Sequence, residues 1–82
     1  MYYLYILKCS DNSFYTGITN DLKKRMIAHG QGKGSKYVRS RLPFKLVYTE
    51  KIKTKSLALK KELEVKKLRR EEKEELVKQA RK

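Results

Sequence analysis

The sequence has little of what marks several large classes of protein. It contains no tryptophan, one proline and one cysteine, and only 9 acidic residues stand against 22 lysines and arginines in 82 positions. A lone Cys9 cannot form an internal disulfide or a zinc cluster of cysteines. No apolar run approaches the roughly 20 residues of a membrane span, and the first residues do not form the pattern of a signal peptide. These absences indicate a protein of the reducing cytoplasm that does not span a membrane.

The excess of basic residues is the strongest signal in the composition. The formal net charge is +13, and the resulting self-repulsion is relieved best by a polyanionic partner. Nucleic acid is the first candidate for that partner. An anionic membrane surface is the second, but the helical segments lack the large aromatic face that an interfacial helix presents. We therefore expect nucleic acid as the partner, and no membrane.

Three segments have the alternation of apolar and polar residues that predicts β-strands. Residues 2–9 and 14–18 lie on either side of the turn-forming stretch SDNS, so they predict a hairpin, and residues 44–52 predict a third strand. Helical spacing predicts a helix from an N-cap at Asn20 to about residue 29. Shorter and longer helical segments follow at 36–41, 55–70 and 70–82, the last either separate from its predecessor or continuous with it.

The predicted order is β-β-α-β-α-α in one domain that covers residues 1–82. Strands that are joined by a short turn pair antiparallel, and helices must cover the apolar faces of the sheet. The fold class is therefore α+β, with a three-stranded, mostly antiparallel sheet flanked by helices. The residues from about 69 onward form a basic, helical C-terminal extension.

Tyr5 and Tyr15 lie ten residues apart, on the two strands of the predicted hairpin. A two-residue turn that pairs Ser10 with Ser13 would put the two side chains on opposite faces of the sheet. An odd number of loop residues, or a bulge, would put them on the same face. The sequence leaves both registers open, and a site shared by the two tyrosines requires the odd one.

The first predicted helix has one side that combines apolar and ionisable residues. Leu22, Arg25, Met26 and His29 recur at positions i, i+3, i+4 and i+7, so they share the side that should face the sheet. Arg25 could bind a phosphate there, or it could snorkel past the sheet edge or pair with a carboxylate. His29 could assist in chemistry, or it could be a helix-end histidine that the helix dipole favours.

Glu62 is the remaining polar residue of interest. It falls within an apolar arc of its predicted helix, where a carboxylate needs a partner or a metal. The alternative is an i,i+4 pair with Lys66, which contributes only about 0.2–0.5 kcal/mol. Tyrosine, arginine, histidine and one carboxylate together suit phosphodiester cleavage. Arginine matches phosphate geometry, one carboxylate with waters and phosphate oxygens suits Mg²⁺, and a nearby cation favours the phenolate of tyrosine.

These residues resemble the GIY-YIG nuclease domain, and in particular its short stand-alone, YhbQ-like branch. The resemblance is carried by YLY at 3–5 and YTG at 15–17, followed by Arg25, His29 and Glu62, and it covers nearly the whole chain. Tyr3, Leu4 and Thr16 depart from the outer positions of the two motifs. The resemblance implies a three-stranded antiparallel sheet flanked by helices. It also implies a metal-dependent endonuclease that hydrolyses phosphodiester bonds in DNA.

The resemblance also implies a role for each matching residue. Tyr5 and Tyr15 shape the site, and one of them, most often the first, acts as general base. His29 assists proton transfer, Arg25 stabilises the charge on the phosphate, and Gly17 lets backbone or substrate come close. Glu62 holds the divalent metal, Mg²⁺ or Mn²⁺. Characterised members usually carry a separate DNA-binding domain that this sequence lacks, so we expect selection of a DNA structure rather than a sequence.

Other basic residues beside this site would contact nucleic acid through its phosphates, with DNA favoured over RNA. Such contacts carry affinity but no sequence information. The residues are Lys33, Lys36, Arg39 and Arg41. Two alternatives to a nuclease stay open. One is a non-catalytic nucleic-acid-binding module on the same fold, and the other is an accessory protein whose C-terminal helix docks a partner through Leu68, Leu76 and Val77.

Overall fold

The computed structural model describes residues 1–80, and its centre is a three-stranded antiparallel sheet. The predicted helix end at residues 81 and 82 lies outside the described residues. The elements follow the order β1 (Tyr2–Lys8), β2 (Phe14–Thr19), α1 (Leu22–Gly30), α2 (Lys36–Arg39), β3 (Lys45–Ile52), α3 (Lys55–Lys66) and α4 (Arg70–Ala80). The strand order is β2-β1-β3, and β1 pairs antiparallel with both neighbours. The predicted fold class and element order are confirmed.

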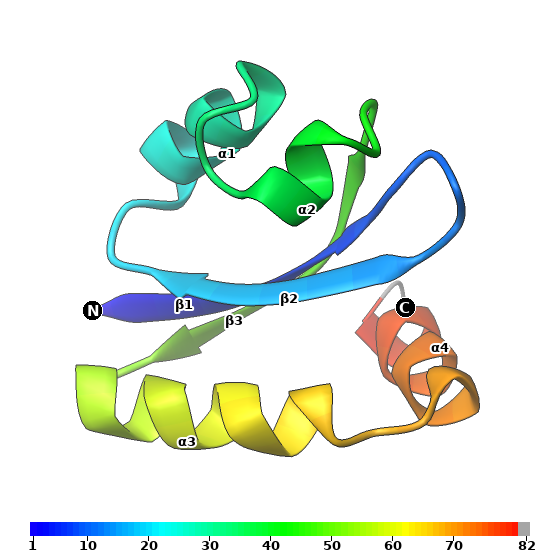
Figure 1. Ribbon diagram of the computed structural model, residues 1–82. Coiled ribbons are helices and arrows are strands. Elements are labelled where there is room, and N and C mark those ends of the chain that lie inside the picture. The colour runs from blue at the N-terminus through cyan, green and yellow to red at the C-terminus, as the bar shows by residue number, and fades with distance from the viewer. Residues whose placement is uncertain (81–82) are drawn as a thin grey trace.

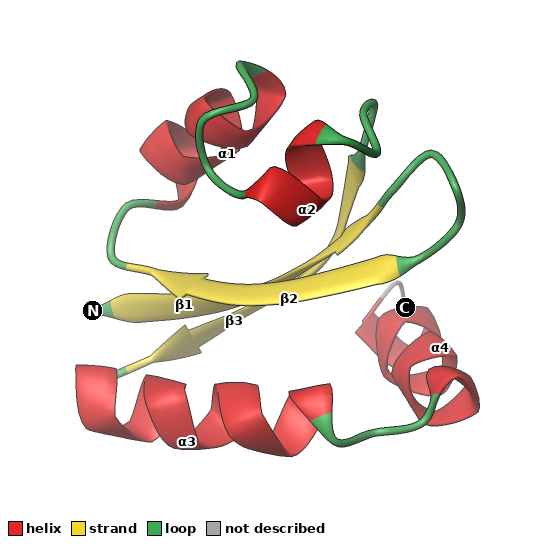
Figure 2. Cartoon of the chain, in the orientation of Figure 1, coloured by secondary structure: helices red, strands yellow, loops and turns green. Residues whose placement is uncertain are grey.

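Helices cover both faces of the sheet, as Figure 1 shows and Figure 2 repeats by element type. Alternate residues of β1 point into two separate apolar clusters. Leu4 and Ile6 pack with Val65 of α3 and Val77 of α4. Tyr5, Leu7 and Cys9 form the other cluster, with Val38 of α2. Each fully buried aliphatic side chain stabilises the fold by about 1.5–3 kcal/mol. Because alternate side chains of β1 point to opposite faces, this one strand packs against the helices on both sides of the sheet.

The hairpin between β1 and β2 has a three-residue loop, which settles the register that the sequence left open. The amide of Cys9 donates to the carbonyl of Ser13 over 2.9 Å, and Asn12 takes a positive φ of 67°. A turn that ends in a left-handed residue is common in three-residue hairpin loops. Tyr5 therefore pairs with Gly17 and Leu7 with Tyr15. Tyr5 and Tyr15 consequently lie on the same face.

The predicted start of the first helix is wrong by one residue. The N-cap is Asp21, not Asn20, because the Asp21 carboxylate accepts a hydrogen bond from the amide of Lys24 over 3.0 Å. An aspartate at this position also places its negative charge at the positive end of the helix dipole. The cap matters for function because it sets where the first turn of α1 begins, and hence which side chains face the sheet.

The long C-terminal helical segment is two helices and not one. The predicted helix over 55–70 ends at Lys66, and α4 starts afresh at Arg70. Leu68 lies between them and packs against the sheet, together with Leu76 and Val77. The turn lets α4 return across the sheet, so these apolar residues bury against their own domain and are not free to dock a partner. Within residues 1–80 there is no helix with the length and apolar character that crossing a membrane requires.

Candidate active site

The centre of the candidate site is a hydrogen bond between Tyr5 of β1 and His29 of α1. The Tyr5 hydroxyl lies 2.8 Å from Nε2 of His29. Tyr5 is 2% exposed and His29 is 1% exposed. His29 reaches the sheet because it is in the last turn of α1, on the side that also carries Leu22 and Met26, which pack against the same cluster as Tyr5. The helical spacing thus places the imidazole of His29 next to the buried hydroxyl of Tyr5.

Tyr15 completes an enclosure of aromatic rings around His29. Its ring meets the His29 ring edge to face, with centroids 5.6 Å apart and planes at 72°. Tyr5 meets His29 in a similar way, and Phe44 covers a further side at 6.0 Å. Edge-to-face contacts of this kind favour a fixed ring orientation. The histidine is therefore held on three sides by rings from β1, β2 and the residue just before β3.

Two glycines allow the backbone to approach the Tyr5–His29 pair closely. A Cβ atom on Gly17 would lie 2.5 Å from the Tyr5 hydroxyl oxygen, and one on Gly34 would lie 2.5 Å from Nδ1 of His29. The motif that contains Gly17 predicts such a close approach. The approach at Gly34 depends on how the loop after α1 folds back over His29, and no local pattern in the sequence reveals that.

Burial and neighbouring charges shift the pKa values of both central groups. Burial raises the pKa of Tyr5 far above its usual value; Tyr15 and Glu62 add to the rise, whereas Arg25 opposes it. Burial lowers the pKa of His29, and Arg25 lowers it further. At neutral pH the pair is therefore a neutral phenol bonded to a neutral imidazole. Nδ1 of His29 is buried and has no hydrogen-bond partner among residues 1–80.

Arg25 and Glu62 bring opposite charges to the pair from different helices. Arg25 is half-buried on α1, and its charge acts on both Tyr5 and His29. Glu62 is on α3, which packs against β2 and β1 from the opposite face of the sheet (Figure 1). Its side chain is 17% exposed, and Lys66 lies 3.4 Å from one of its carboxylate oxygens. The carboxylate is thus sheltered, as its place in the apolar arc predicts, and it has the i,i+4 partner of the alternative interpretation.

Glu62 offers a single carboxylate, so it suits only a metal ion that needs few protein ligands. In the described part of the chain, no three or more residues among His, Cys, Asp and Glu come together as a metal site. Mg²⁺ is commonly held by one or two carboxylates and otherwise by waters and substrate phosphates. One oxygen of Glu62 faces Lys66, which leaves the other available. The residues present therefore fit a magnesium-type ion that arrives with its phosphate substrate.

The predicted phosphate contacts separate into two groups. Lys33, Lys36 and Arg39 are exposed, and no ion pair within residues 1–80 involves them. Arg41 differs, because its Nε donates to Asp11 over 3.0 Å and its Nη1 donates to the carbonyl of Tyr37 and the hydroxyl of Ser40. Its charge is compensated and its Nε and Nη1 donors are engaged, so the geometry suits it less than its neighbours for phosphate binding.

Tyr37 is the site residue that the sequence analysis missed. Its ring stacks on Tyr15 with centroids 5.8 Å apart and planes at 28°, and the guanidinium of Arg41 lies 3.8 Å from its centroid. In the sequence Tyr37 is one aromatic in a short basic turn, without a motif around it. The turn is α2, whose N-cap Ser35 accepts hydrogen bonds from the amides of Tyr37 and Val38. That cap orients α2 so that Tyr37 meets Tyr15.

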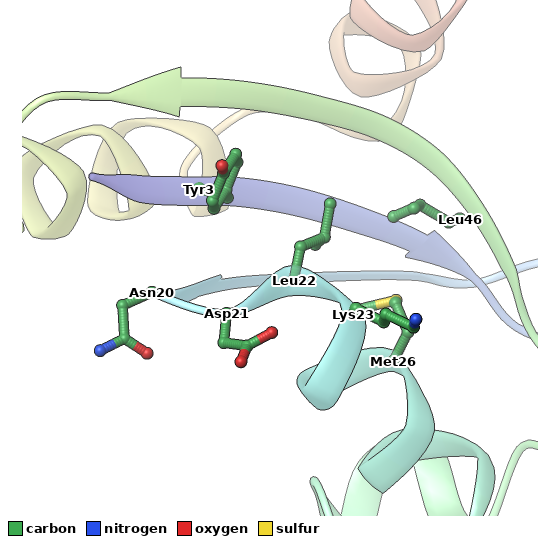
Figure 3. A pocket seen from close by; sticks show the side chains of 7 residues that line it. All are labelled: Tyr3, Asn20, Asp21, Leu22, Lys23, Met26 and Leu46. Atoms are coloured by element: carbon green, nitrogen blue, oxygen red, sulfur yellow. The ribbon is translucent and has the colours of Figure 1, made fainter.

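One groove on the described surface lies away from this cluster. It has a volume of about 510 Å³ and runs between the first turn of α1 and the strands β1 and β3. Tyr3, Leu22, Met26 and Leu46 give it a mainly apolar lining (Figure 3). None of the ionisable groups around Tyr5 and His29 lines it. The groove is therefore not part of the candidate site around Tyr5 and His29.

The fold, with the Tyr5–His29 pair beside Tyr15 and under the charges of Arg25 and Glu62, is that of a small nuclease-type domain. The chain belongs to the GIY-YIG family: the family model described as "GIY-YIG catalytic domain" matches residues 1–75. The resemblance drawn from the two tyrosine motifs is confirmed. Because the match begins at β1 and ends within α4, it covers both layers that surround the sheet.

Relatives of similar length support the same assignment. A UPF0213 protein of Staphylococcus saprophyticus is 49% identical over 76 residues, which cover 93% of each chain. One from Clostridium perfringens is 52% identical over 77 residues, 94% of this chain and 83% of the relative. The solution NMR structure of a UPF0213 protein from Bacillus halodurans matches with a TM-score of 0.62 at 49% identity, over 95% of this chain and 84% of that one. A solution NMR structure of an E. faecalis protein matches with a TM-score of 0.66 at 41% identity, over 95% and 83%.

Proposed function

We propose that this protein is a cytoplasmic, metal-dependent endonuclease that hydrolyses phosphodiester bonds in DNA, selecting a DNA structure rather than a sequence. The observation that carries the proposal is the buried hydrogen bond between Tyr5 and His29, next to the charge of Arg25. A structural tyrosine needs only one partner of any kind. A neutral imidazole behind a phenol, with the charge of an arginine acting on both, is suited to proton transfer near a phosphate.

The pKa directions favour the pair over Tyr5 alone as the general base. The raised pKa of Tyr5 makes its phenolate scarce at neutral pH. The lowered pKa of His29 keeps its imidazole neutral and able to accept a proton at Nε2. As the Tyr5 oxygen takes a proton from the attacking water, its own proton can pass to Nε2 of His29. The hydroxide oxygen then bonds to phosphorus while the bond to the leaving oxygen breaks, and the leaving oxygen takes up a proton from solvent. The proton on Nε2 of His29 afterwards returns to the Tyr5 oxygen as that oxygen releases the proton it took from the water.

Arg25 and Glu62 contribute charge to the same step. Arg25 would stabilise the extra negative charge on the phosphate oxygens in the transition state. Glu62 would hold Mg²⁺ or Mn²⁺, which when bound neutralises phosphate charge and stabilises the leaving oxygen. Tyr15 keeps the His29 ring in the orientation that receives the proton. Exposed Lys33, Lys36 and Arg39 would bind the flanking phosphates without reading bases.

The test compares Glu62→Gln with Glu64→Gln, an exposed carboxylate on the same helix. Labelled single-stranded, duplex and branched DNA are incubated with Mg²⁺, with Mn²⁺ and with EDTA. We expect metal-dependent cleavage by the wild type and by Glu64→Gln, and none by Glu62→Gln, which should still bind DNA. Cleavage that persists in EDTA or in Glu62→Gln contradicts the role of Glu62.

The second candidate is a nucleic-acid-binding module that does not cleave. It is favoured by the Lys66 ammonium next to Glu62, which already compensates the carboxylate without a metal. In the same assay this candidate predicts binding in every lane and cleavage in none.

A further inference from the structure

Beside the Tyr5–His29 pair, three flat side chains lie one on another and end at the protein surface. Tyr15 stacks on Tyr37, and the Arg41 guanidinium lies over the Tyr37 ring. Tyr15 is half-buried, whereas Tyr37 is 36% exposed and the Arg41 side chain 35% exposed. Five of the six tyrosines in the chain are buried or half-buried, and Tyr37 is exposed. We call Tyr37 and Arg41 together the stacking surface.

The stacking surface is held rigid by contacts from outside it. Asp11, in the β1–β2 loop, accepts from Nε of Arg41, and the amide of Ser10 donates to the Arg41 carbonyl over 3.0 Å. Nη1 of Arg41 is engaged by Tyr37 and Ser40. With Nε and Nη1 engaged, the guanidinium is held flat over the Tyr37 ring, and its outer face stays available. A fixed guanidinium plane is one of the surfaces on which proteins stack unpaired bases.

The position of the stacking surface relates it to the reacting phosphate. Tyr37 is one ring-to-ring step of 5.8 Å from Tyr15, and Tyr15 is one step of 5.6 Å from His29. The stacking surface is therefore two ring contacts away from the group that accepts the proton in the proposed mechanism. Lys36 and Arg39 are exposed on the same short helix as Tyr37, so cationic side chains flank the stacking surface.

We propose that an unpaired nucleobase neighbouring the cleaved phosphate stacks on the outer face of the Arg41 guanidinium, which the Tyr37 ring supports from below. This inference rests on the proposed function for the location of that phosphate. In a duplex both faces of each base are covered by its neighbours, so a base can reach the stacking surface only from a single strand, a branch or a flipped nucleotide. The stacking surface thereby gives a physical reason for preferring a nucleic-acid structure over a sequence, because every base has a face that can stack.

The experiment measures binding apart from cleavage. Fluorescence anisotropy is recorded in EDTA, in the Glu62→Gln background, with single-stranded DNA, single-stranded RNA, duplex DNA and a duplex with a single-stranded branch. We expect Tyr37→Leu to weaken binding to the single-stranded and branched ligands about tenfold, the loss typical of one stacked base. Duplex affinity should change less than twofold. Tyr37→Phe should match the unchanged residue, since stacking needs the ring and not the hydroxyl.

Two matched comparisons separate stacking from other effects. Moving one abasic site along the single strand should reveal a position where the loss of the base costs about tenfold with Tyr37 present and nothing further in Tyr37→Leu. Arg41→Lys keeps the charge but removes the plane, so it should also weaken single-strand binding selectively. Arg39→Gln removes only a phosphate contact, so it should weaken binding to all ligands alike.

Three results would overturn the proposal: equal losses for single strand and duplex in Tyr37→Leu, no loss with any ligand, or a fall in cleavage with single-strand affinity intact. The last would mean that Tyr37 only supports Tyr15. Equal effects of Tyr37→Leu on DNA and RNA support recognition of the base face, and an effect confined to one of them points to the sugar and counts against it. A wild type that shows the selective binding but never cleaves refutes the proposed nuclease and leaves the stacking surface standing.

Discussion

The hydroxyl of Tyr5 and Nε2 of His29 lie 2.8 Å apart although 24 residues separate them in the chain. Tyr5 is on the central strand and His29 is at the end of the helix that follows the hairpin. Almost no surface of either residue is exposed, so solvent does not compete for the bond. The pair therefore links the sheet to α1 and supplies the reacting group of the proposed mechanism, which makes both roles measurable with one substitution.

Tyr5→Phe keeps the ring and removes the hydroxyl. We expect the rate of single-turnover cleavage to fall by about 10²–10⁴-fold, the range for loss of a general base, and DNA affinity to change little. The free energy of unfolding in urea should fall by about 1 kcal/mol for the lost hydrogen bond. Tyr48→Phe is the matched control, because Tyr48 donates to Glu50 over 2.8 Å on the other face of the sheet. A rate that falls equally in both variants would assign the effect to stability.

The stability of the protein should decrease as the pH falls below the pKa of a free histidine, about 6.5. The pKa of His29 is lowered in the folded state by burial and by Arg25 on the same helix, with Tyr5 and Tyr15 facing it from the sheet. The unfolded chain therefore binds more protons between about pH 6.5 and the lower folded pKa, so folding free energy is lost on acidification through that window. His29 is the only histidine, so NMR of its ring should report that folded pKa directly.

The midpoint temperature of thermal unfolding should fall between pH 7.5 and pH 5 in the wild type. In His29→Gln the same change in pH should lower the midpoint less. A ring pKa at or above 6.5 contradicts the prediction.

Gly34→Ala should disturb the site, whereas Gly30→Ala should not. A Cβ at Gly34 would lie 2.5 Å from Nδ1 of His29, while nothing lies within 4 Å of a Cβ at Gly30. Overpacking of a close contact costs about 1–3 kcal/mol, so we expect Gly34→Ala to lower the unfolding free energy by that amount and to shift the His29 ring signals. Gly30→Ala, in the last turn of α1, should be neutral or more stable by up to about 1 kcal/mol. Unchanged His29 signals in Gly34→Ala would show that the loop moves aside freely.

The salt dependence of DNA binding should distinguish Arg39 from Arg41. The logarithm of affinity falls with the logarithm of salt concentration in proportion to the number of phosphates contacted. Arg39→Gln removes an unpaired exposed charge and should reduce that slope by about 1. Arg41→Gln removes a charge that Asp11 already compensates, so its slope should match the wild type. If both variants reduced the slope equally, Arg41 would also contact a phosphate, and the prediction would be wrong.

Much of the fold follows from local patterns. The period of two in residues 2–9 places Tyr5, Leu7 and Cys9 on one face and Leu4 and Ile6 on the other, as the two clusters confirm. The spacing of Arg25 and His29 likewise predicts which side of α1 faces the sheet. These predictions succeed because they need only the geometry of one strand or one helix. The helix bounds are less accurate, since Asp21 and Asn20 are both good caps and only the chain path selects between them.

By itself, the sequence determined the strands and helices, the side of each that faces the core, the charge that favours a polyanionic partner, and the motif that identifies the family. Only the tertiary structure decided which side chains of different elements come into contact. A single loop residue, Asn12 in its left-handed conformation, sets the register that brings Tyr15 to the face of Tyr5. The stacking of Tyr37 on Tyr15 and the pairing of Arg41 with Asp11 join segments about 20 and 30 residues apart. Such contacts depend on loop conformation and on the packing of whole helices, and short-range sequence patterns do not encode either.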